Sequence, residues 1–167
     1  MWPSRGNEQI YYNASDETNI LYACHYAGLI PAGPGKSHQS IRDISLLGAL
    51  PNCTIIQPGN AAETALAVAY CVDRAEENCV LRLVIGPSPR LIELPEDYQF
   101  SPGRGVSLRP GDDAVLFAYG PVMLHEAMLA SELLADRNFG LRVINMPWLN
   151  KVDPDWLGEV VEPYRQI

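Results

Sequence analysis

The chain contains no apolar run that approaches the roughly 20 residues needed to span a bilayer. Its first residues show no basic stretch followed by an apolar one, as a secretory leader would. Basic residues are few: 12 lysines and arginines against 20 acidic residues give a formal net charge of -8. An acidic surface is repelled by nucleic acid and by anionic membranes, which disfavours both as main partners. We therefore expect a soluble, cytoplasmic protein that binds neither nucleic acid nor a membrane.

Cysteine does not occur at metal-binding spacing in this chain. The four cysteines, Cys24, Cys53, Cys71 and Cys79, include no C-x-x-C pair. Three of them sit in or beside apolar strand patterns, where cysteine behaves as a small hydrophobic residue. We expect reduced, buried thiols and no cysteine-based metal site.

Hydrophobic residues make up 47% of the 167-residue chain, enough for one fair core or two small ones. The first half alternates strand and helix patterns with short connections, which is typical of right-handed parallel β-α-β units. The predicted elements are a strand over 19–25, a helix over 40–48, a strand over 53–57, a long helix capped by Asn60 and a strand over 79–85.

The pattern breaks between residues 86 and 113, where five prolines stand at 87, 89, 95, 102 and 110. We predict an extended linker there, with a short strand near residues 105–108. A second α/β unit follows, with a strand over 114–119, a helix over 121–136, a strand over 141–146 and a helix opened by Asp153.

The resulting domain division is 1–86, a linker over 87–113, and 114–167. The second sheet has only two strands in this prediction, and two parallel strands cannot bury both faces. We therefore expect the second domain to be truncated or completed by another chain.

A glycine-rich bend with the sequence GPGKSHQ occupies residues 33–39, and its glycines let the backbone turn sharply. A short helix follows, then LPN at 50–52, then Pro58, Asn60 and Glu63. This order and spacing resembles the pyrimidine-binding domain of the transketolase family of thiamine diphosphate enzymes. In that family a G-x-S/T-H-Q bend precedes a short helix, an L/I-P-N strand and an x-P-x-D/N-x-x-E helix start.

The second α/β unit is similar to the family's C-terminal domain. Residues 118–120 match a strand that ends in small residues and glycine, 143–147 a strand leading into a proline loop, and 153–157 the start of the next helix. The likeness covers residues 19–161. It implies an α/β fold in which a partial parallel-sheet pyrimidine-binding domain is followed by a partial α/β C-terminal domain.

The resemblance assigns roles to individual side chains. His38 matches the family histidine that reaches toward the reacting carbons of the donor, and the near-neutral pKa of a histidine suits proton transfer. The resemblance also implies substrate contacts at His25, Lys36, Ser37 and Arg82. Spacing alone leaves a solvent-facing loop histidine open at position 38, and a structural role open for His25 at its strand end.

Two residues depart from the family pattern. Pro34 stands where sugar-using members usually have an aspartate that contacts substrate hydroxyls. Ile85 falls near the arginine that commonly binds the substrate phosphate, and isoleucine cannot replace a bidentate guanidinium. A non-standard or unphosphorylated substrate fits these departures, although Lys36 offers a point charge.

The family's cofactor ligands are largely missing. The family glutamate that activates the cofactor lies on a helix before the first strand, and Glu8 lies too close to that strand to match it. Nothing resembles the family's glycine-aspartate-glycine motif for diphosphate and magnesium. We therefore expect most ligands of thiamine diphosphate and Mg²⁺ to lie outside this chain.

Three further charged residues follow the bend and the second strand. Glu63 has the pattern of a first-turn carboxylate favoured by the helix dipole, and Arg42 with Asp43 that of a solvated ion pair. We expect all three on helix surfaces.

The leading hypothesis is a fragment or subunit of a transketolase-like enzyme that moves a two-carbon ketol unit between small sugars. It would be active only as a homodimer or with a complementary subunit. One alternative is the β-subunit of a 2-oxo acid dehydrogenase, with a 2-oxo acid substrate and lipoamide as acceptor. Another is a non-catalytic α/β interaction module. The S-H-Q bend favours transketolase over the dehydrogenase.

Overall fold

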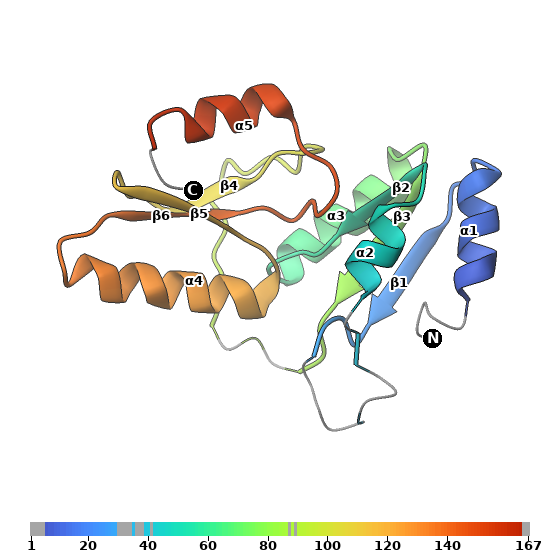
Figure 1. The fold of residues 1–167 in the computed structure, drawn as a ribbon, viewed down its shortest axis with the longest axis horizontal. Coiled ribbons are helices and arrows are strands. Elements are labelled where there is room, and N and C mark those ends of the chain that lie inside the picture. The colour runs from blue at the N-terminus through green and yellow to red at the C-terminus, as the bar shows by residue number, and fades with distance from the viewer. Residues whose placement is uncertain are drawn as a thin grey trace.

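The computed structural model describes residues 6–29, 35, 39–40, 42–86, 88 and 90–164. Its backbone forms two three-stranded sheets, each flanked by helices (Figure 1). The first sheet contains β1 (Leu21–His25), β2 (Cys53–Ile56) and β3 (Asn78–Leu83). Their order is β1-β3-β2 and all neighbours are parallel, so the predicted α/β fold with a parallel first sheet is confirmed.

Helices cover both faces of the first sheet. One face packs against α1 (Asn7–Ser15) and α2 (Asp43–Gly48), and the other against α3 (Ala61–Asp73). Every residue of β2 is buried, as its continuous apolar run predicts. Helix α1 has little apolar periodicity from which it could be predicted, because only Ile10 and Ala14 of this polar helix are buried. Helix α2 begins at Asp43, later than predicted, and the N–H of Ser40 before it donates to the carbonyl of Gly28.

The predicted cap of α3 is confirmed. The side-chain oxygen of Asn60 accepts from the N–H of Glu63 at 2.7 Å, and Asn60 itself has an extended backbone. Capping of this kind satisfies one of the N–H groups that a helix start leaves without an internal partner.

The second sheet has three strands, so the prediction of two is wrong. The order is β4 (Val106–Arg109), β6 (Leu141–Asn145) and β5 (Ala114–Ala118). Strands β5 and β6 are parallel, and β4 lies antiparallel to β6. The strand predicted near residues 105–108 is β4; its sequence shows neither its partner nor its direction. The two faces of this sheet pack against α4 (Gly120–Ala135) and α5 (Pro154–Val161) (Figure 1).

The segment after β6 joins the two domains. The N–H of Gln57 donates to the carbonyl of Pro147 at 2.8 Å, and the N–H of Leu149 to that of Ile55 at 2.9 Å. The side chain of Asn150 then accepts from Ile55 N–H and donates to the Cys53 carbonyl. Between these bonds Trp148 lies in the first domain's core, 2% exposed. The edge of the first sheet is therefore completed by second-domain residues.

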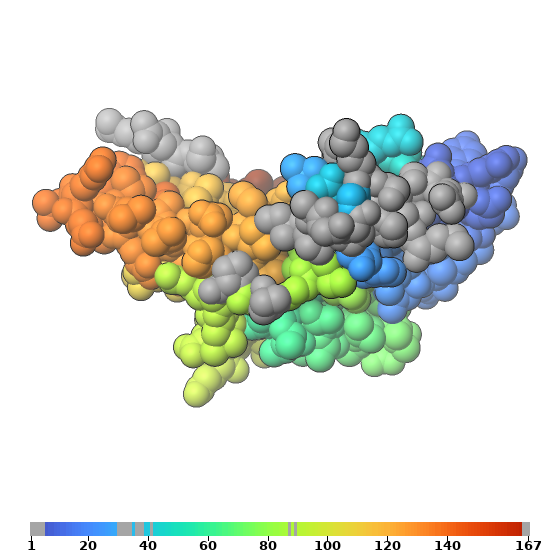
Figure 2. Space-filling view, turned by 90° about the horizontal axis from the view of Figure 1, so that it is seen from below, coloured from blue at the N-terminus to red at the C-terminus, as the bar shows by residue number. Residues whose placement is uncertain are grey.

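The segment from residue 90 to 100 lies between α3 and α4 on the face shown in Figure 2. Within it Ile92 is buried in the second domain's core, whereas Phe100 is buried in the first domain's core. No helix in the described part of the chain is long and apolar enough to cross a membrane.

Candidate functional site

The carboxyl ends of β1, β2 and β3 meet at one edge of the first sheet, because the three strands are parallel. In open α/β sheets this is the edge where ligands bind. Here the edge faces the turn between β5 and α4 of the second domain, so residues of both domains border it. We take this edge as the candidate site.

Arg82 of β3 forms a buried ion pair at this edge. Its Nε donates to Oδ2 of Asp43 at 2.6 Å, and the side chains are only 5% and 4% exposed. A second guanidinium N–H donates to the side-chain carbonyl of Gln57. The expectation that Asp43 forms a solvated surface pair is therefore wrong. Asp43 starts α2 where that helix packs on β3, and a buried guanidinium needs a nearby counter-charge.

The base of the glycine-rich bend is anchored at the same edge. The N–H of Ser40 donates to the Gly28 carbonyl at 2.7 Å, and the side-chain amide of Gln39 to the Leu29 carbonyl at 3.0 Å. The N–H of Ala27 donates to the Leu83 carbonyl, which ties the segment that precedes the bend to β3. Lys36, Ser37 and His38 lie outside the described residues.

His25 ends β1 and is exposed, with its ring centroid 4.9 Å from that of Tyr26. Cys24, rather than His25, is in register with Arg82. Because successive side chains of a strand leave opposite faces, His25 and Arg82 leave opposite faces of the sheet. The structure thus brings both to the carboxyl edge without placing them together.

A hollow of about 380 Å³ opens at the junction of the two domains. We call it the seam hollow. It is lined by residues that follow β1 and β2, by the end of β3 and by the start of α4: Ala27, Gly28, Leu29, Gln57, Arg82, Val84, Tyr119, Val122 and Met123. Gln57, Tyr119 and Met123 were not predicted as site residues. In this part of the second domain, the sequence signal was the glycine at position 120, where a strand leads into a helix.

Gly120 explains how closely α4 approaches the first sheet. Its φ is +66°, and a Cβ added there would lie 2.4 Å from Nε2 of Gln57. A side chain at this position would therefore be strained and would collide with Gln57. The glycine allows Gln57 to lie between Arg82 and the α4 turn.

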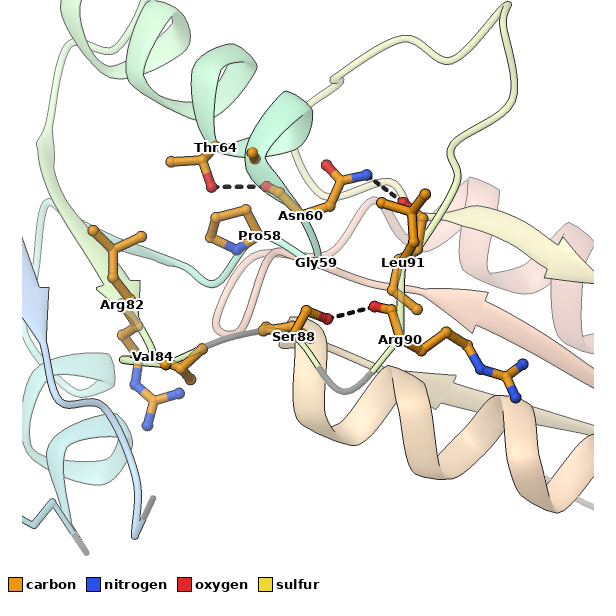
Figure 3. Close-up of a pocket in the computed structure, with 14 residues that line it drawn as sticks. Pro58, Gly59, Asn60, Thr64, Arg82, Val84, Ser88, Arg90 and Leu91 are labelled. Carbon is orange, nitrogen blue, oxygen red and sulfur yellow. Dashed lines mark hydrogen bonds between the residues drawn. The ribbon is translucent and has the colours of Figure 1, made fainter. Parts of the chain in front are cut away.

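A second hollow, of about 410 Å³, lies beside the start of α3 and shares Arg82 and Val84 with the seam hollow (Figure 3). Its polar groups are bonded within the protein. Thr64 donates to the Asn60 carbonyl, the Asn60 amide to the Ile92 carbonyl, and the Ser88 hydroxyl to the Arg90 carbonyl. Figure 3 shows the guanidinium group of Arg90 directed away from Asn60. It pairs with Glu132 at 2.7 Å.

Glu63 is also buried, so its prediction as a surface charge is wrong. The residue is 0% exposed. Its Oε2 accepts from Gly59 N–H at 2.6 Å, and its Oε1 accepts from the Tyr98 hydroxyl at 2.6 Å and the Asn145 amide at 2.8 Å. These donors replace water around the carboxylate. Burial, followed by the charge of Glu63, raises the pKa of the Tyr98 hydroxyl.

The cysteines are free and buried, as predicted. Burial, with a smaller effect of Asp43, raises the pKa of Cys24 to about 11. The described residues contain no group of three or more histidine, cysteine, aspartate or glutamate side chains that could hold a metal ion.

Two family profiles match consecutive parts of the chain. The family described as the transketolase pyrimidine-binding domain matches residues 1–84, and that described as the transketolase C-terminal domain matches residues 103–167. Together they follow the order of the two sheets.

Curated relatives share this region. Transketolase-like protein 1 of Mus musculus is 27% identical over 151 residues, covering 90% of this chain and 25% of that protein. The 1-deoxy-D-xylulose-5-phosphate synthase of Synechococcus sp. (strain WH7803) is 32% identical over 139 residues, covering 83% of this chain and 21% of that protein. The chain thus spans a quarter or less of the length of these relatives.

Solved structures show the same fold. A split-gene transketolase, described as an inactive β4 tetramer, superposes with a TM-score of 0.74 at 27% identity, covering 91% of this chain and 49% of that one. A Pichia stipitis transketolase mutant gives a TM-score of 0.76 at 19% identity, covering 98% of this chain and 25% of that one, which shows the fold alone. With both domain profiles matched in order, the chain belongs to the transketolase family.

Proposed function

We propose that this chain is the part of a transketolase-like enzyme that supplies its pyrimidine-binding and C-terminal domains. Its reaction is the transfer of a two-carbon ketol unit between sugars or sugar-like substrates. The observation that carries this proposal is the likeness to the split-gene transketolase, which runs through both domains over 91% of this chain. That protein is described as the product of a split gene.

Family membership implies thiamine diphosphate as cofactor, which when bound supplies the reactive carbon that takes up the ketol unit. The described residues offer no metal-binding group. We therefore assign the ligands of Mg²⁺ and of the diphosphate to other segments or to a complementary subunit. In this proposal the present chain supplies the wall that faces the aminopyrimidine ring and the substrate.

His38 is the proposed proton-transfer residue. Cleaving the bond next to the donor carbonyl requires a substrate hydroxyl to lose its proton, and an imidazole within hydrogen-bond reach can accept it. The hydrogen bonds between Ser40 and Gly28 and between Gln39 and Leu29 support this role, since they hold the ends of the bend at the carboxyl edge.

The other proposed contacts surround the same edge. Lys36 and Ser37 neighbour His38 in sequence, and His25 ends β1. Arg82 uses two of its N–H groups for Asp43 and Gln57, whereas a guanidinium carries five donors. We propose that a further N–H of Arg82 donates to a substrate oxygen.

The active form is proposed to be a homodimer or an assembly with a complementary subunit. The split-gene transketolase supports this, because the tetramer described for it contains only β chains and is inactive. We accordingly expect the isolated chain to be inactive. A domain division at residues 86 and 114 remains part of the proposal.

The relatives suggest a second reaction. One of them, at 32% identity, is a 1-deoxy-D-xylulose-5-phosphate synthase. Formation of 1-deoxy-D-xylulose 5-phosphate by an assembly that contains this chain would favour the synthase over the transketolase activity.

The test is reconstitution from the native cell. The tagged chain is captured with its partners in the presence of thiamine diphosphate and Mg²⁺, and the complex is assayed for ketol transfer from a panel of ketoses to aldoses. A parallel incubation with a small-molecule extract is analysed for the synthase product by mass spectrometry.

A complex carrying His38→Ala is the control. We expect ketol transfer by the wild-type complex and a loss of roughly 10²-fold or more in the variant. A captured complex that binds thiamine diphosphate but transfers no ketol unit would contradict the proposal. It would favour the non-catalytic interaction module instead.

A further inference from the structure

We propose that the seam hollow accepts the end of the substrate that carries no phosphate, an uncharged arm ending in a methyl or another apolar group. This inference rests on the proposed function, because it names the substrate class of the same site. It is carried by the lining of the hollow, by the compensated charge of Arg82 and by the position of the hollow at the base of the bend.

The lining is mainly apolar. Five of its side chains are hydrocarbon or thioether groups: Ala27, Leu29, Val84, Val122 and Met123. Leu29 and Met123 are 58% and 52% exposed, so apolar surface is open to solvent at the hollow. The volume of about 380 Å³ lies within the range of small-molecule sites, roughly 300–1,000 Å³.

The charge at the hollow is already balanced. Among the described lining residues Arg82 is the one cation, and Asp43 pairs with it at 2.6 Å in a buried position. A phosphate dianion beside Arg82 would also approach the carboxylate of Asp43, and that repulsion is weakly screened where both side chains are buried. An uncharged hydroxyl or carbonyl oxygen can accept an N–H of Arg82 without this repulsion. Ile85, which follows Val84, is 41% exposed and adds no charge.

The hollow borders the proposed reaction site. Gly28 and Leu29 line it, and their carbonyls accept the hydrogen bonds from Ser40 and Gln39 that close the base of the bend. A molecule in the hollow therefore contacts the backbone that leads into the segment of His38. The apolar arm lies in the hollow.

The first experiment uses the full chain labelled with ¹³C in its methionine methyl groups. Met123 lines the seam hollow, whereas Met128 and Met146 pack against the two domain cores and serve as internal controls. The probes are 5-deoxy-D-xylulose and D-xylulose 5-phosphate, which differ in a hydrogen or a phosphate at the terminal carbon. We expect 5-deoxyxylulose to shift the Met123 resonance and to bind at least about tenfold more tightly than the phosphate ester.

Three results would overturn the inference: tighter or equal binding of xylulose 5-phosphate, a shift of Met123 with inorganic phosphate alone, or no shift of Met123 with either sugar. Shifts of Met128 and Met146 equal to that of Met123 would likewise place the sugar elsewhere.

A matched pair of variants adds a second measurement. Met123→Lys introduces a cation at the rim, and Met123→Gln removes the thioether without adding charge. Saturation-transfer spectra of the sugars should show a gain of about tenfold for xylulose 5-phosphate in the lysine variant only. Both variants should bind 5-deoxyxylulose more weakly than the wild type does. An unchanged preference in Met123→Lys, with an unchanged circular dichroism spectrum, would contradict the inference.

The two proposals fail in different ways. If the reconstituted complex transfers no ketol unit while 5-deoxyxylulose still shifts the Met123 resonance, the proposed function fails. The inference that the seam hollow binds an uncharged, apolar arm then still holds. If the complex uses xylulose 5-phosphate more efficiently than 5-deoxyxylulose, the ligand class fails and the proposed function holds.

Discussion

Asp43 and Glu63 occupy the same local position, the first turn of a helix that follows the carboxyl edge, yet they are buried in different ways. Asp43 pairs with the guanidinium of Arg82. Glu63 has no cation among its bonded partners and is held by a backbone N–H, a phenol and an amide. The first arrangement balances charge within one domain, whereas the second distributes hydrogen bonds over both domains.

The difference shows what each carboxylate does. Arg82 and Asp43 join β3 to α2, so this pair fixes the element that follows the bend. Glu63 joins α3 to Asn145 at the end of β6 and to Tyr98 of the connecting segment. Asp43 thus organises the candidate site, and Glu63 holds the second domain in place beside it.

Arg82→Met should have the largest effect, because it leaves Asp43 buried without a counter-charge. Removing one partner of a buried pair costs about 3–5 kcal/mol. Urea unfolding measures this loss, with the exposed pair of Arg104 and Asp153 as the matched control. Arg104→Met should cost no more than about 1 kcal/mol. The double variant Arg82→Met with Asp43→Leu should recover most of the lost stability. Equal losses in the single and double variants would show that the charge of Asp43 is not the cause.

Glu63→Gln tests the arrangement without a cation. The new amide keeps the shape of the side chain, but its NH₂ group is a donor. It would face the Gly59 N–H in one orientation, or the Tyr98 hydroxyl and the Asn145 amide in the other, and all of these are donors too. An unsatisfied buried donor costs about 1–3 kcal/mol. Unfolding in urea should show this loss, and hydrogen exchange should increase at the segment joining β6 to the first sheet. The exposed Glu126→Gln on α4 is the control and should leave both measurements unchanged.

Local signals in the sequence were enough for most of the fold. Strand and helix order, the Asn60 cap and the buried thiols all depend on neighbouring residues or on simple periodicity. The pairing of β4 with β6, and the burial of Asp43 and Glu63, do not. Glu63 bonds to a residue 82 positions away, and Asp43 to one 39 positions away. A first-turn carboxylate looks the same in sequence whether its helix start faces water or another domain.

The candidate site also has residues that the local sequence could place and residues that it could not. His25 and Arg82 could be placed at the carboxyl edge because both stand near strand ends. Gln57, Tyr119 and Met123 line the hollow because the start of α4 lies beside Gln57, and no local pattern predicts that contact. The shared core around Trp148 has the same origin, since its residues come from both domains.

Gly120→Ala tests the contact between α4 and Gln57, the residue that accepts a hydrogen bond from Arg82. The added methyl group would need the unfavourable φ of +66° and would lie within 3.0 Å of three Gln57 atoms. We expect a loss of about 1–2 kcal/mol in urea unfolding. Gly158→Ala is the matched control, because α5 leaves open space at that glycine. It should be neutral or stabilising by up to about 1 kcal/mol. If both variants behave alike, the approach of α4 to Gln57 does not constrain position 120.

Lys151→Met should have the smallest effect and tests a carboxylate that combines both arrangements. Glu77 accepts from the Thr54 hydroxyl at 2.5 Å and from Lys151 of the second domain, and it is partly exposed. Burial raises the pKa of Glu77, but hydrogen bonds from Lys151 and Thr54 and the charge of Lys151 outweigh it, so the pKa is lowered from 4.5.

A lowered pKa in the folded state stabilises the protein at pH values above the pKa of the unfolded state, and this contribution is lost as the pH falls below that pKa. Lys151→Met should therefore reduce stability by up to about 1 kcal/mol at pH 7, discounted for solvent screening. Below pH 4.5 the difference from the wild type should shrink toward zero. Urea unfolding of both proteins between pH 3 and pH 7 measures the difference, and a gap that stays constant with pH would show that Lys151 contributes through packing of its side chain rather than through charge.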